Sequence, residues 1–233
     1  ARRVCTGVAE RAPVPPGVAA LHADRVRTER DGPATTLKAE EAGQPLDQLR
    51  IVAPRPETVP AGPFAVQFVP VSHSIPESAA LIIDTPAGRV AHTGDFKLDG
   101  TPVVGEAFDP ILWHDIAQEQ PIKALACDST NVFSPNPGRS EALLANPLLD
   151  FVMAQRQMVV ATTFASNLAR LKTLADAGIA SGRRICLLGR AMRRMVTVAI
   201  ETGILTSFPP VISPEEAAEM PHDKVMLIVT GSQ

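Results

Sequence analysis

The feature that most constrains the fold is a change of pattern near the middle of the chain. Before residues 131–139, short apolar segments follow one another closely, and after them apolar strands alternate with helical stretches. The sequence Ser134-Pro135-Asn136-Pro137-Gly138 fits neither pattern, because proline and glycine interrupt both strands and helices. The chain is therefore predicted to be an α/β protein with two folding units that meet near this stretch.

The first unit is predicted to be a β-meander. Its strand-like segments cover residues 64–71, 80–84 and 89–92, and Thr85-Pro86-Ala87-Gly88 between the last two has proline at the second position of a turn. Closely spaced strands joined by a tight turn are typical of antiparallel pairing. A further apolar strand is predicted at residues 122–127.

The second unit is predicted to contain a parallel sheet. Strands that alternate with helices pair in parallel, and the helices cover both faces of their sheet. The predicted elements are strands at residues 158–162, 184–188 and 225–229 and helices around residues 140–156, 167–177 and 191–202.

Composition excludes several classes of protein. The 233 residues carry a net charge of −3, so the chain as a whole is not a generic binder of polyanions, and any nucleic-acid contact must use a local basic patch. No apolar run approaches the roughly 18 residues of a membrane span. Three widely spaced cysteines, Cys5, Cys127 and Cys186, do not suggest a disulfide framework, and a reducing cytoplasm is the expected compartment.

The two ends differ from the rest of the chain. Residues 1–34 show no sustained period and are predicted to be an irregular or divergent segment, for which a loose linker and out-of-frame translation are open explanations. At the other end, Thr230-Gly231-Ser232-Gln233 is typical of a turn that opens a further helix. We therefore expect a fragment of a longer protein.

Potential metal ligands follow the apolar strands of the first half. His73 and Asp95 each lie in a loop just after a strand, and Asp128 follows the strand at residues 122–127. Loops that leave the same edge of a sheet can bring an imidazole and carboxylates to one ion. Each residue also has an ordinary structural explanation, since a single histidine is often structural and aspartate is common in turns and helix caps.

Polar and basic turns follow the strands of the second half. Ser166 and Asn167 follow the first of these strands, and Arg190, Arg193 and Arg194 follow the second. Parallel strands bring such turns to one carboxyl edge, where helix N-termini and arginines can bind phosphate. Helix capping by Ser166 and a solvated arginine face are the alternative, and both interpretations stay open at this point.

Seven stretches taken in order resemble the ribonuclease J family, which belongs to the β-CASP branch of the metallo-β-lactamase superfamily. They are SHSIPES, HTGDFKLD, CDSTN, PGRSE, TTFASNLAR, GRAMRRM and TGSQ, and the resemblance extends from about residue 49 to residue 233. It implies a partial metallo-β-lactamase αββα sandwich at residues 35–135 and a partial, inserted β-CASP α/β domain at residues 136–233. It also implies a cytoplasmic hydrolase with 5′-to-3′ exonuclease and endonuclease activity.

The resemblance also implies roles for individual residues. His73 and Asp95 match metal ligands of a centre with two divalent ions, usually zinc, and Asp128 matches an acidic residue that we assign to orienting a ligand histidine. The turns with Ser166, Asn167, Arg190, Arg193 and Arg194 match positions that contact the RNA backbone. The implied substrate is single-stranded RNA with a 5′-monophosphate end, and the family forms homodimers or homotetramers.

The chain also departs from the family. The His-x-His-x-Asp-His motif, which supplies most metal ligands and the acid/base aspartate, has no match before His73, and no later histidine motif is present. Two ligands cannot hold two zinc ions that each need four or five donors, so we expect little turnover. The alternative is a non-catalytic RNA-binding relative that has lost its metal site, and a hydrolase of small esters or thioesters ranks lowest.

Overall fold

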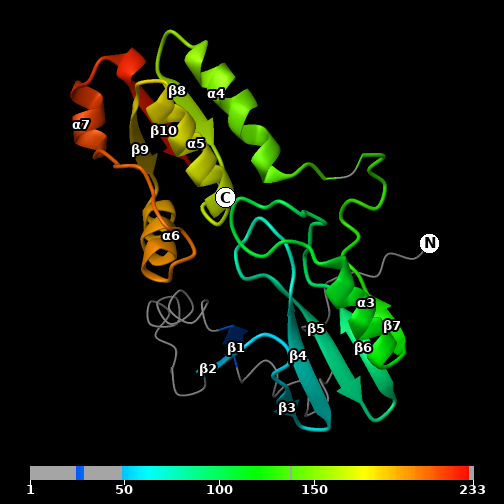
Figure 1. Ribbon diagram of the computed structural model, residues 1–233. Coiled ribbons are helices and arrows are strands. Elements are labelled where there is room, and N and C mark those ends of the chain that lie inside the picture. The colour runs from blue at the N-terminus through cyan, green and yellow to red at the C-terminus, as the bar shows by residue number, and fades with distance from the viewer. Residues whose placement is uncertain (1–24, 29–48, 137, 231–233) are drawn as a thin grey trace, which may run out of the picture.

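The computed structural model describes residues 25–28, 49–136 and 138–230, and its two larger sheets form separate units joined by the segment after β7 (Figure 1). The first unit is a five-stranded sheet in the order β3-β4-β5-β6-β7. Its strands are β3 (Val59–Ala61), β4 (Phe64–Pro70), β5 (Ala79–Thr85), β6 (Gly88–His92) and β7 (Ile122–Ala126). Strands β3 to β6 pair antiparallel and β7 pairs parallel to β6, which confirms the predicted meander.

One face of this sheet packs against helix α3 (Pro110–Glu119), an element that the sequence analysis did not predict. Alternate residues of β5, Ala80 and Ile82, are buried together with Ala91 of β6 and with Ile116 of the helix. The helix begins at Asp109, whose carboxylate accepts hydrogen bonds from two backbone N–H groups of the first turn. The period of two along β5 therefore selects the face that the helix covers.

A short pair of strands precedes this sheet. Strand β1 (Arg25–Thr28) pairs in parallel with β2 (Leu49–Val52). Strand β1 lies within residues 1–34, the segment expected to be mostly irregular, and its four residues are too few for a period to be recognised in the sequence. The rest of that segment lies outside the described residues.

The second unit is a parallel sheet in the order β8-β10-β9, which confirms the predicted pairing. Its strands are β8 (Val159–Thr162), β9 (Arg184–Leu188) and β10 (Val225–Val229), and its helical elements are η1 (Glu141–Leu144), α4 (Ala145–Met153), α5 (Leu168–Ala180), α6 (Arg190–Glu201), α7 (Pro214–Glu219) and η2 (His222–Lys224). Within the described residues, no helix has the length and apolar character that a membrane span needs.

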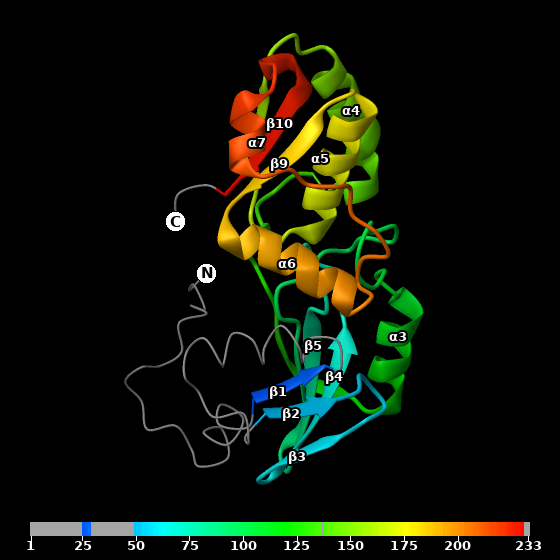
Figure 2. The same ribbon diagram turned by 90° about the vertical axis from the view of Figure 1, so that its left-hand side faces the viewer.

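Helices cover both faces of the parallel sheet, as predicted. Ile185 and Met226 lie in a core with residues of α5 and α6, whereas Cys186 and Val225, their chain neighbours, pack on the opposite face against Ala217 of α7. Figure 2 accordingly places α7 and α5 on opposite sides of β9 and β10. Adjacent residues of a strand point to opposite faces, so each strand contributes to both cores.

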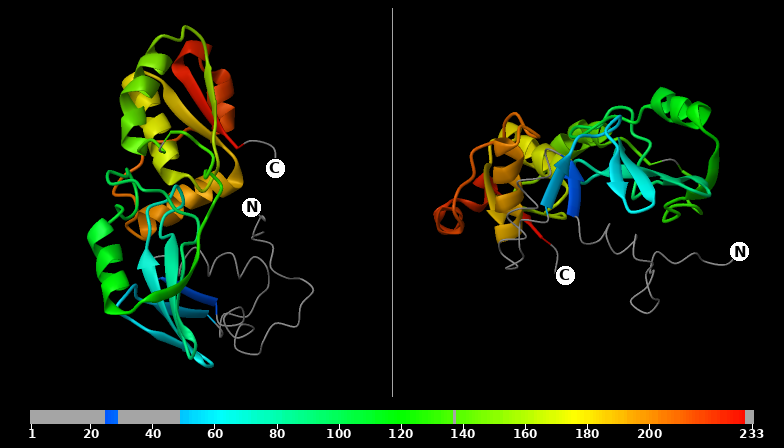
Figure 3. Two further views of the ribbon diagram at one scale, coloured as in Figure 1. Left: turned by 90° about the vertical axis from the view of Figure 1, so that its right-hand side faces the viewer. Right: turned by 90° about the horizontal axis from the view of Figure 1, so that it is seen from below.

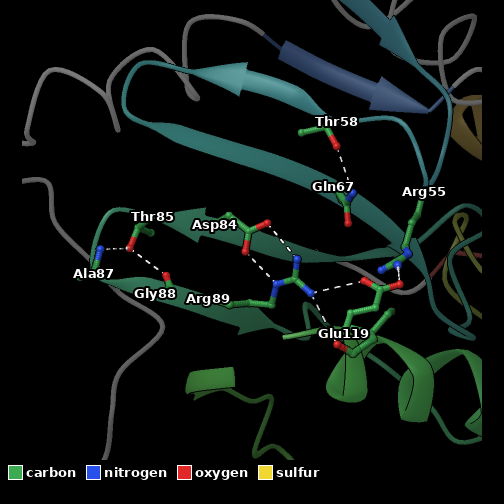
Figure 4. A network of polar contacts seen from close by, with 10 residues as sticks. Arg55, Thr58, Gln67, Asp84, Thr85, Ala87, Gly88, Arg89 and Glu119 are labelled. Carbon is green, nitrogen blue, oxygen red and sulfur yellow. Dashed lines mark hydrogen bonds and ion pairs between the residues drawn. The ribbon is translucent and has the colours of Figure 1, made fainter. Parts of the chain in front are cut away.

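An ion-pair network joins the β5–β6 hairpin to α3 (Figure 4). Arg89 is 6% exposed and donates two hydrogen bonds to Asp84, at 2.7 and 2.9 Å. The same guanidinium lies 3.5 Å from Glu119, which also pairs with Arg55. The side-chain hydrogen bond from Arg89 outweighs desolvation and lowers the pKa of Asp84. The carboxylates thus compensate a charge that the fold buries.

Asp84→Asn is expected to lower the free energy of unfolding by about 2 kcal/mol at pH 7, because Arg89 loses its bidentate partner. The pKa of this carboxyl group is lower in the folded state than in the unfolded state. The carboxylate therefore stabilises the fold at pH values above the unfolded-state pKa, and this contribution is lost as the pH falls below about 4. Urea unfolding at pH 7 and pH 3 measures both effects. Asp176→Asn, which breaks the exposed Lys172–Asp176 pair, is the control, and equal losses in the two variants would contradict the prediction.

Candidate functional site

The candidate residues of the first half lie on loops at one edge of the five-stranded sheet. Strands β4 and β6 run in the same direction because both are antiparallel to β5, and β7 is parallel to β6. Their carboxyl ends therefore share an edge. His73, Asp95 and Asp128 each follow one of these three strands. The topology brings together the loops that the sequence analysis singled out.

Backbone contacts tie these loops to one another. Thr93 donates its N–H to Ala126 at 2.9 Å, and its hydroxyl accepts the N–H of Asp128 at 3.0 Å. The N–H of Lys97 donates to the carbonyl of Ser72, next to His73, at 2.7 Å. The loop that carries Asp95 is thus bonded to the loops on both sides of it. Thr93 and Lys97 were not among the candidates, although both lie in the HTGDFK stretch.

His73 is half-buried, and its ring is held by the chain around it. The N–H of Ile75 donates to Nδ1 of His73 at 3.2 Å. A metal ion that bound at Nδ1 would have to displace this N–H group. The ring also adjoins a hollow lined by Phe68, Pro70 and Pro76.

Asp128 occupies a side-chain-stabilised turn. Its Oδ1 accepts the N–H of Thr130 at 2.9 Å and the Thr130 hydroxyl at 2.6 Å. These two bonds lower the pKa of Asp128, a positive charge on His73 adds to the effect, and burial opposes it. The carboxylate is ionised at neutral pH and lies close enough to His73 to interact electrostatically. The turn that the sequence analysis kept as an alternative is therefore present.

The described residues do not by themselves fit a metal centre. Among residues 25–28, 49–136 and 138–230, no group of three or more His, Cys, Asp or Glu side chains is placed to hold an ion. Asp95 is exposed at the edge, and Nδ1 of His73 is occupied by a backbone N–H. Zinc needs at least three protein donors in a catalytic site.

The candidate residues of the second half also share one edge. Strands β8, β9 and β10 are parallel, so the turns that follow them lie together at their carboxyl ends. The N–H of Thr163 donates to the carbonyl of Val229 at 3.0 Å, which joins two of these turns. A Cβ added to Gly189 would lie 3.5 Å from Thr230, so the third turn is also close.

Two helices begin at this edge. Asn167 caps α5, because its side-chain oxygen accepts the N–H of Arg170 at 3.0 Å. The cap is therefore Asn167, one residue after the Ser166 that the sequence suggested. Gly189, with φ of 148°, precedes α6 and provides no side-chain cap, so first-turn N–H groups of α6 can bind an anion.

The arginines of α6 differ in their surroundings. Arg190 and Arg193 are exposed, and Arg193 donates to the carbonyl of Leu187 at 3.4 Å, which holds it near the end of β9. Arg194 is half-buried.

In Figures 2 and 3, α6 lies between the two units, and β4 ends on the side of the first unit that faces the second. The two candidate edges thus lie on facing sides of the units.

Comparison with protein families matches residues 156–233 to "Ribonuclease J, beta-CASP domain". The chain is 40% identical over 177 residues to ribonuclease J of Sinorhizobium meliloti, which covers 76% of the chain and 31% of that protein. It is 41% identical over 173 residues to ribonuclease J of Corynebacterium glutamicum, and the match covers 74% of the chain and 24% of that protein. The chain therefore spans less than a third of the length of these curated relatives.

A more distant relative covers more of the chain. Ribonuclease J of Synechocystis is 35% identical over 201 residues, which are 84% of the chain and 31% of that protein. Among solved structures, a protein of unknown function from Enterococcus faecalis V583 superposes with a TM-score of 0.56 at 15% identity, over 89% of this chain and 53% of that one. This last likeness concerns the fold alone.

Proposed function

Because the chain belongs to the ribonuclease J family, we propose that the protein acts on RNA and that this chain holds the RNA backbone along the carboxyl edge of β8-β10-β9. The observation that carries the proposal is the common edge at which α5 and α6 begin and at which Arg190 and Arg193 are exposed. Phosphate binds to helix N-termini and to arginines, and single-stranded RNA presents a phosphate at every nucleotide.

For the whole protein we propose a metal-dependent RNA hydrolase that prefers a 5′-monophosphate end and uses two divalent ions. In that protein the five-stranded sheet belongs to a metallo-β-lactamase sandwich and residues 136–233 belong to the β-CASP domain. His73 and Asp95 are metal ligands, and Asp128 orients a ligand histidine. The family membership and the shared edge of these three loops support these assignments.

A second candidate function is RNA binding without cleavage. It is favoured by the absence of a three-donor group within the described residues and by the occupied Nδ1 of His73. The chain is then expected to bind RNA without added metal and to release little or no product. Incubation of 5′-phosphorylated RNA with zinc or manganese decides between the two functions. Hydrolysis that disappears in His73→Ala would exclude this second candidate.

Arg193→Ala is expected to weaken binding of single-stranded RNA about tenfold and to reduce the slope of log affinity against log salt by about one, because one phosphate contact is lost. Arg190→Ala is expected to act in the same direction. Fluorescence anisotropy of a labelled RNA across a salt series measures both quantities.

The control for charge is Arg156→Ala. Arg156 is exposed and precedes β8, so it lies at the opposite edge of the same sheet. Its removal changes the net charge equally but is expected to leave the affinity within about twofold, because general attraction is screened over about 10 Å. Equal losses in Arg156→Ala and Arg193→Ala would refute the assigned edge.

A further inference from the structure

Two residues with buried carboxylates, from different halves of the chain, are joined by a hydrogen bond. Asp99 follows the loop of Asp95 in the first unit and is 5% exposed, and Glu141 begins η1 of the second unit and is 8% exposed. The backbone N–H of Glu141 donates to Oδ2 of Asp99 at 3.3 Å. Buried carboxylates need partners, and their partners define a continuous polar link between the units.

Asp99 organises the contact from the side of the first unit. Its Oδ1 accepts the N–H of Thr101 at 3.0 Å, and Lys97 lies 3.5 Å from its Oδ2. Burial alone would raise the pKa of Asp99, but hydrogen bonds from the backbone N–H groups of Thr101 and Glu141, the nearby hydroxyl of Ser140 and the charge of Lys97 together lower it. Asp99 is therefore a buried anion whose partners come from both units.

Ser140 completes the junction. Its hydroxyl donates to the carbonyl of Thr101 at 2.8 Å and accepts the Thr101 hydroxyl at 3.1 Å. The two residues are 39 positions apart in the chain. The hydrogen bonds of this junction thus surround one carboxylate, and they add to an apolar contact in which Val104 of the first unit packs into the core of the second unit.

Glu141 extends the link into the second unit. Its carboxylate binds the guanidinium of Arg170 through both oxygens, with Nη2 of Arg170 at 3.1 Å from Oε2. Arg170 lies in the first turn of α5 and donates its backbone N–H to the Asn167 cap. The link therefore ends at the helix N-terminus where we place the RNA backbone.

The other end of the link reaches the loops of the first edge. The backbone N–H of Lys97 donates to Ser72, the residue before His73, and Lys97 is two residues after Asp95. Contacts thus run without interruption from the loops of His73 and Asp95, through Asp99 and Glu141, to Arg170 and Asn167.

We propose that Asp99 and Glu141 are positioning residues that fix the orientation of the second unit relative to the loops of His73 and Asp95. They touch neither RNA nor metal, and they determine where RNA held at the β8-β10-β9 edge meets the first unit. Units joined by a small contact move relative to each other by default, so removal of the polar link, which leaves the apolar contact of Val104, is expected to increase this motion. The part of the proposal that concerns RNA rests on the proposed function.

Double electron–electron resonance on the full chain tests the orientation. Spin labels at exposed positions, Gln118→Cys on α3 and Ala180→Cys on α5, report the distance between the units. All labelled variants are made in a chain in which Cys5, Cys127 and Cys186 are replaced by alanine, so that only the introduced cysteines carry labels. Asp99→Asn and Glu141→Gln are expected to broaden the distance distribution about twofold, because the chain connection and the apolar contact of Val104 then restrain the units without the polar link. Asp176→Asn, which breaks an exposed ion pair on α5, is expected to leave it unchanged.

Two variants of Ser140 change the junction less than the carboxylate variants do, and they provide a test if a carboxylate variant does not fold. Ser140→Ala removes the hydroxyl of the junction and is expected to broaden the distribution, and Ser140→Thr retains the hydroxyl and is expected to restore it. Unchanged distributions in Ser140→Ala and in every folded carboxylate variant would overturn the proposal. Equal broadening in Ser140→Ala and Ser140→Thr would also overturn it, since the hydroxyl would then be irrelevant.

RNA affinity separates this proposal from the proposed function. Asp99→Asn is expected to weaken binding of 5′-phosphorylated single-stranded RNA about tenfold if the competent orientation falls to about a tenth of the population. The salt slope is expected to stay unchanged, because no phosphate contact is lost, in contrast to Arg193→Ala. A broadened distribution with unaltered affinity would refute the positioning role. A parent chain that does not bind RNA would refute the proposed function, and the distance distributions would still decide the orientation.

Discussion

Gly178→Val is expected to destabilise the second unit by about 3 kcal/mol or more, because the glycine of α5 lies directly on the sheet. A Cβ at this position would lie 2.3 Å from Cδ1 of Ile185 and 2.9 Å from Sδ of Met226. Both side chains are fully buried in the core beneath the helix, so any shift of either one must be accommodated by closely packed neighbours. The helix would have to move away from β9 and β10, which opens the core.

Thermal or urea unfolding followed by circular dichroism measures this effect. Gly178→Ala is expected to cost less, about 1–2 kcal/mol, since the better helix propensity of alanine offsets part of the overlap. Ala180→Val is the matched control, because Ala180 is exposed on the same helix and a valine there has only its lower helix propensity to contribute. A Gly178→Val variant as stable as Ala180→Val would show that α5 does not pack as described.

The regular elements of the second unit were predictable from local pattern. The strands predicted at residues 184–188 and 225–229 coincide with β9 and β10, since each is a short apolar run between polar turns. Helices α3 and α7, whose buried residues are Ile116 and Ala217 respectively, were not predicted. Both begin with a capping side chain followed by proline, the signal from which they could have been found.

The candidate site was predictable only as far as topology follows from sequence. Strand direction places the loops of His73, Asp95 and Asp128 at one edge, and that much could be inferred from strand order. The hydrogen bond that occupies Nδ1 of His73 depends on the local path of the chain. The contact between Asp99 and Glu141 joins positions 42 residues apart, and no local period records such a contact.

Ile116→Ala is expected to lower the free energy of unfolding of the first unit by about 3–4 kcal/mol, because the large buried side chain leaves a cavity that the sheet cannot fill. Ile116 is fully buried between α3 and the sheet, where it packs with Val69, Ala80 and Ile82. The lost packing affects the strands whose loops carry His73 and Asp95. Weakened packing of α3 is therefore expected to loosen the first edge before the second unit unfolds.

Trp113, the single tryptophan, packs against the same core and makes the measurement direct, since its fluorescence reports the first unit while circular dichroism reports both units. In Ile116→Ala the fluorescence transition is expected at lower urea than the transition in circular dichroism. Ile111→Ala is the control, because Ile111 is 70% exposed on the same helix and its truncation is expected to change stability by less than about 0.5 kcal/mol. Coincident transitions in Ile116→Ala would mean that the two units unfold together, and the polar link through Asp99 and Glu141 would then couple their stabilities as well as their orientation.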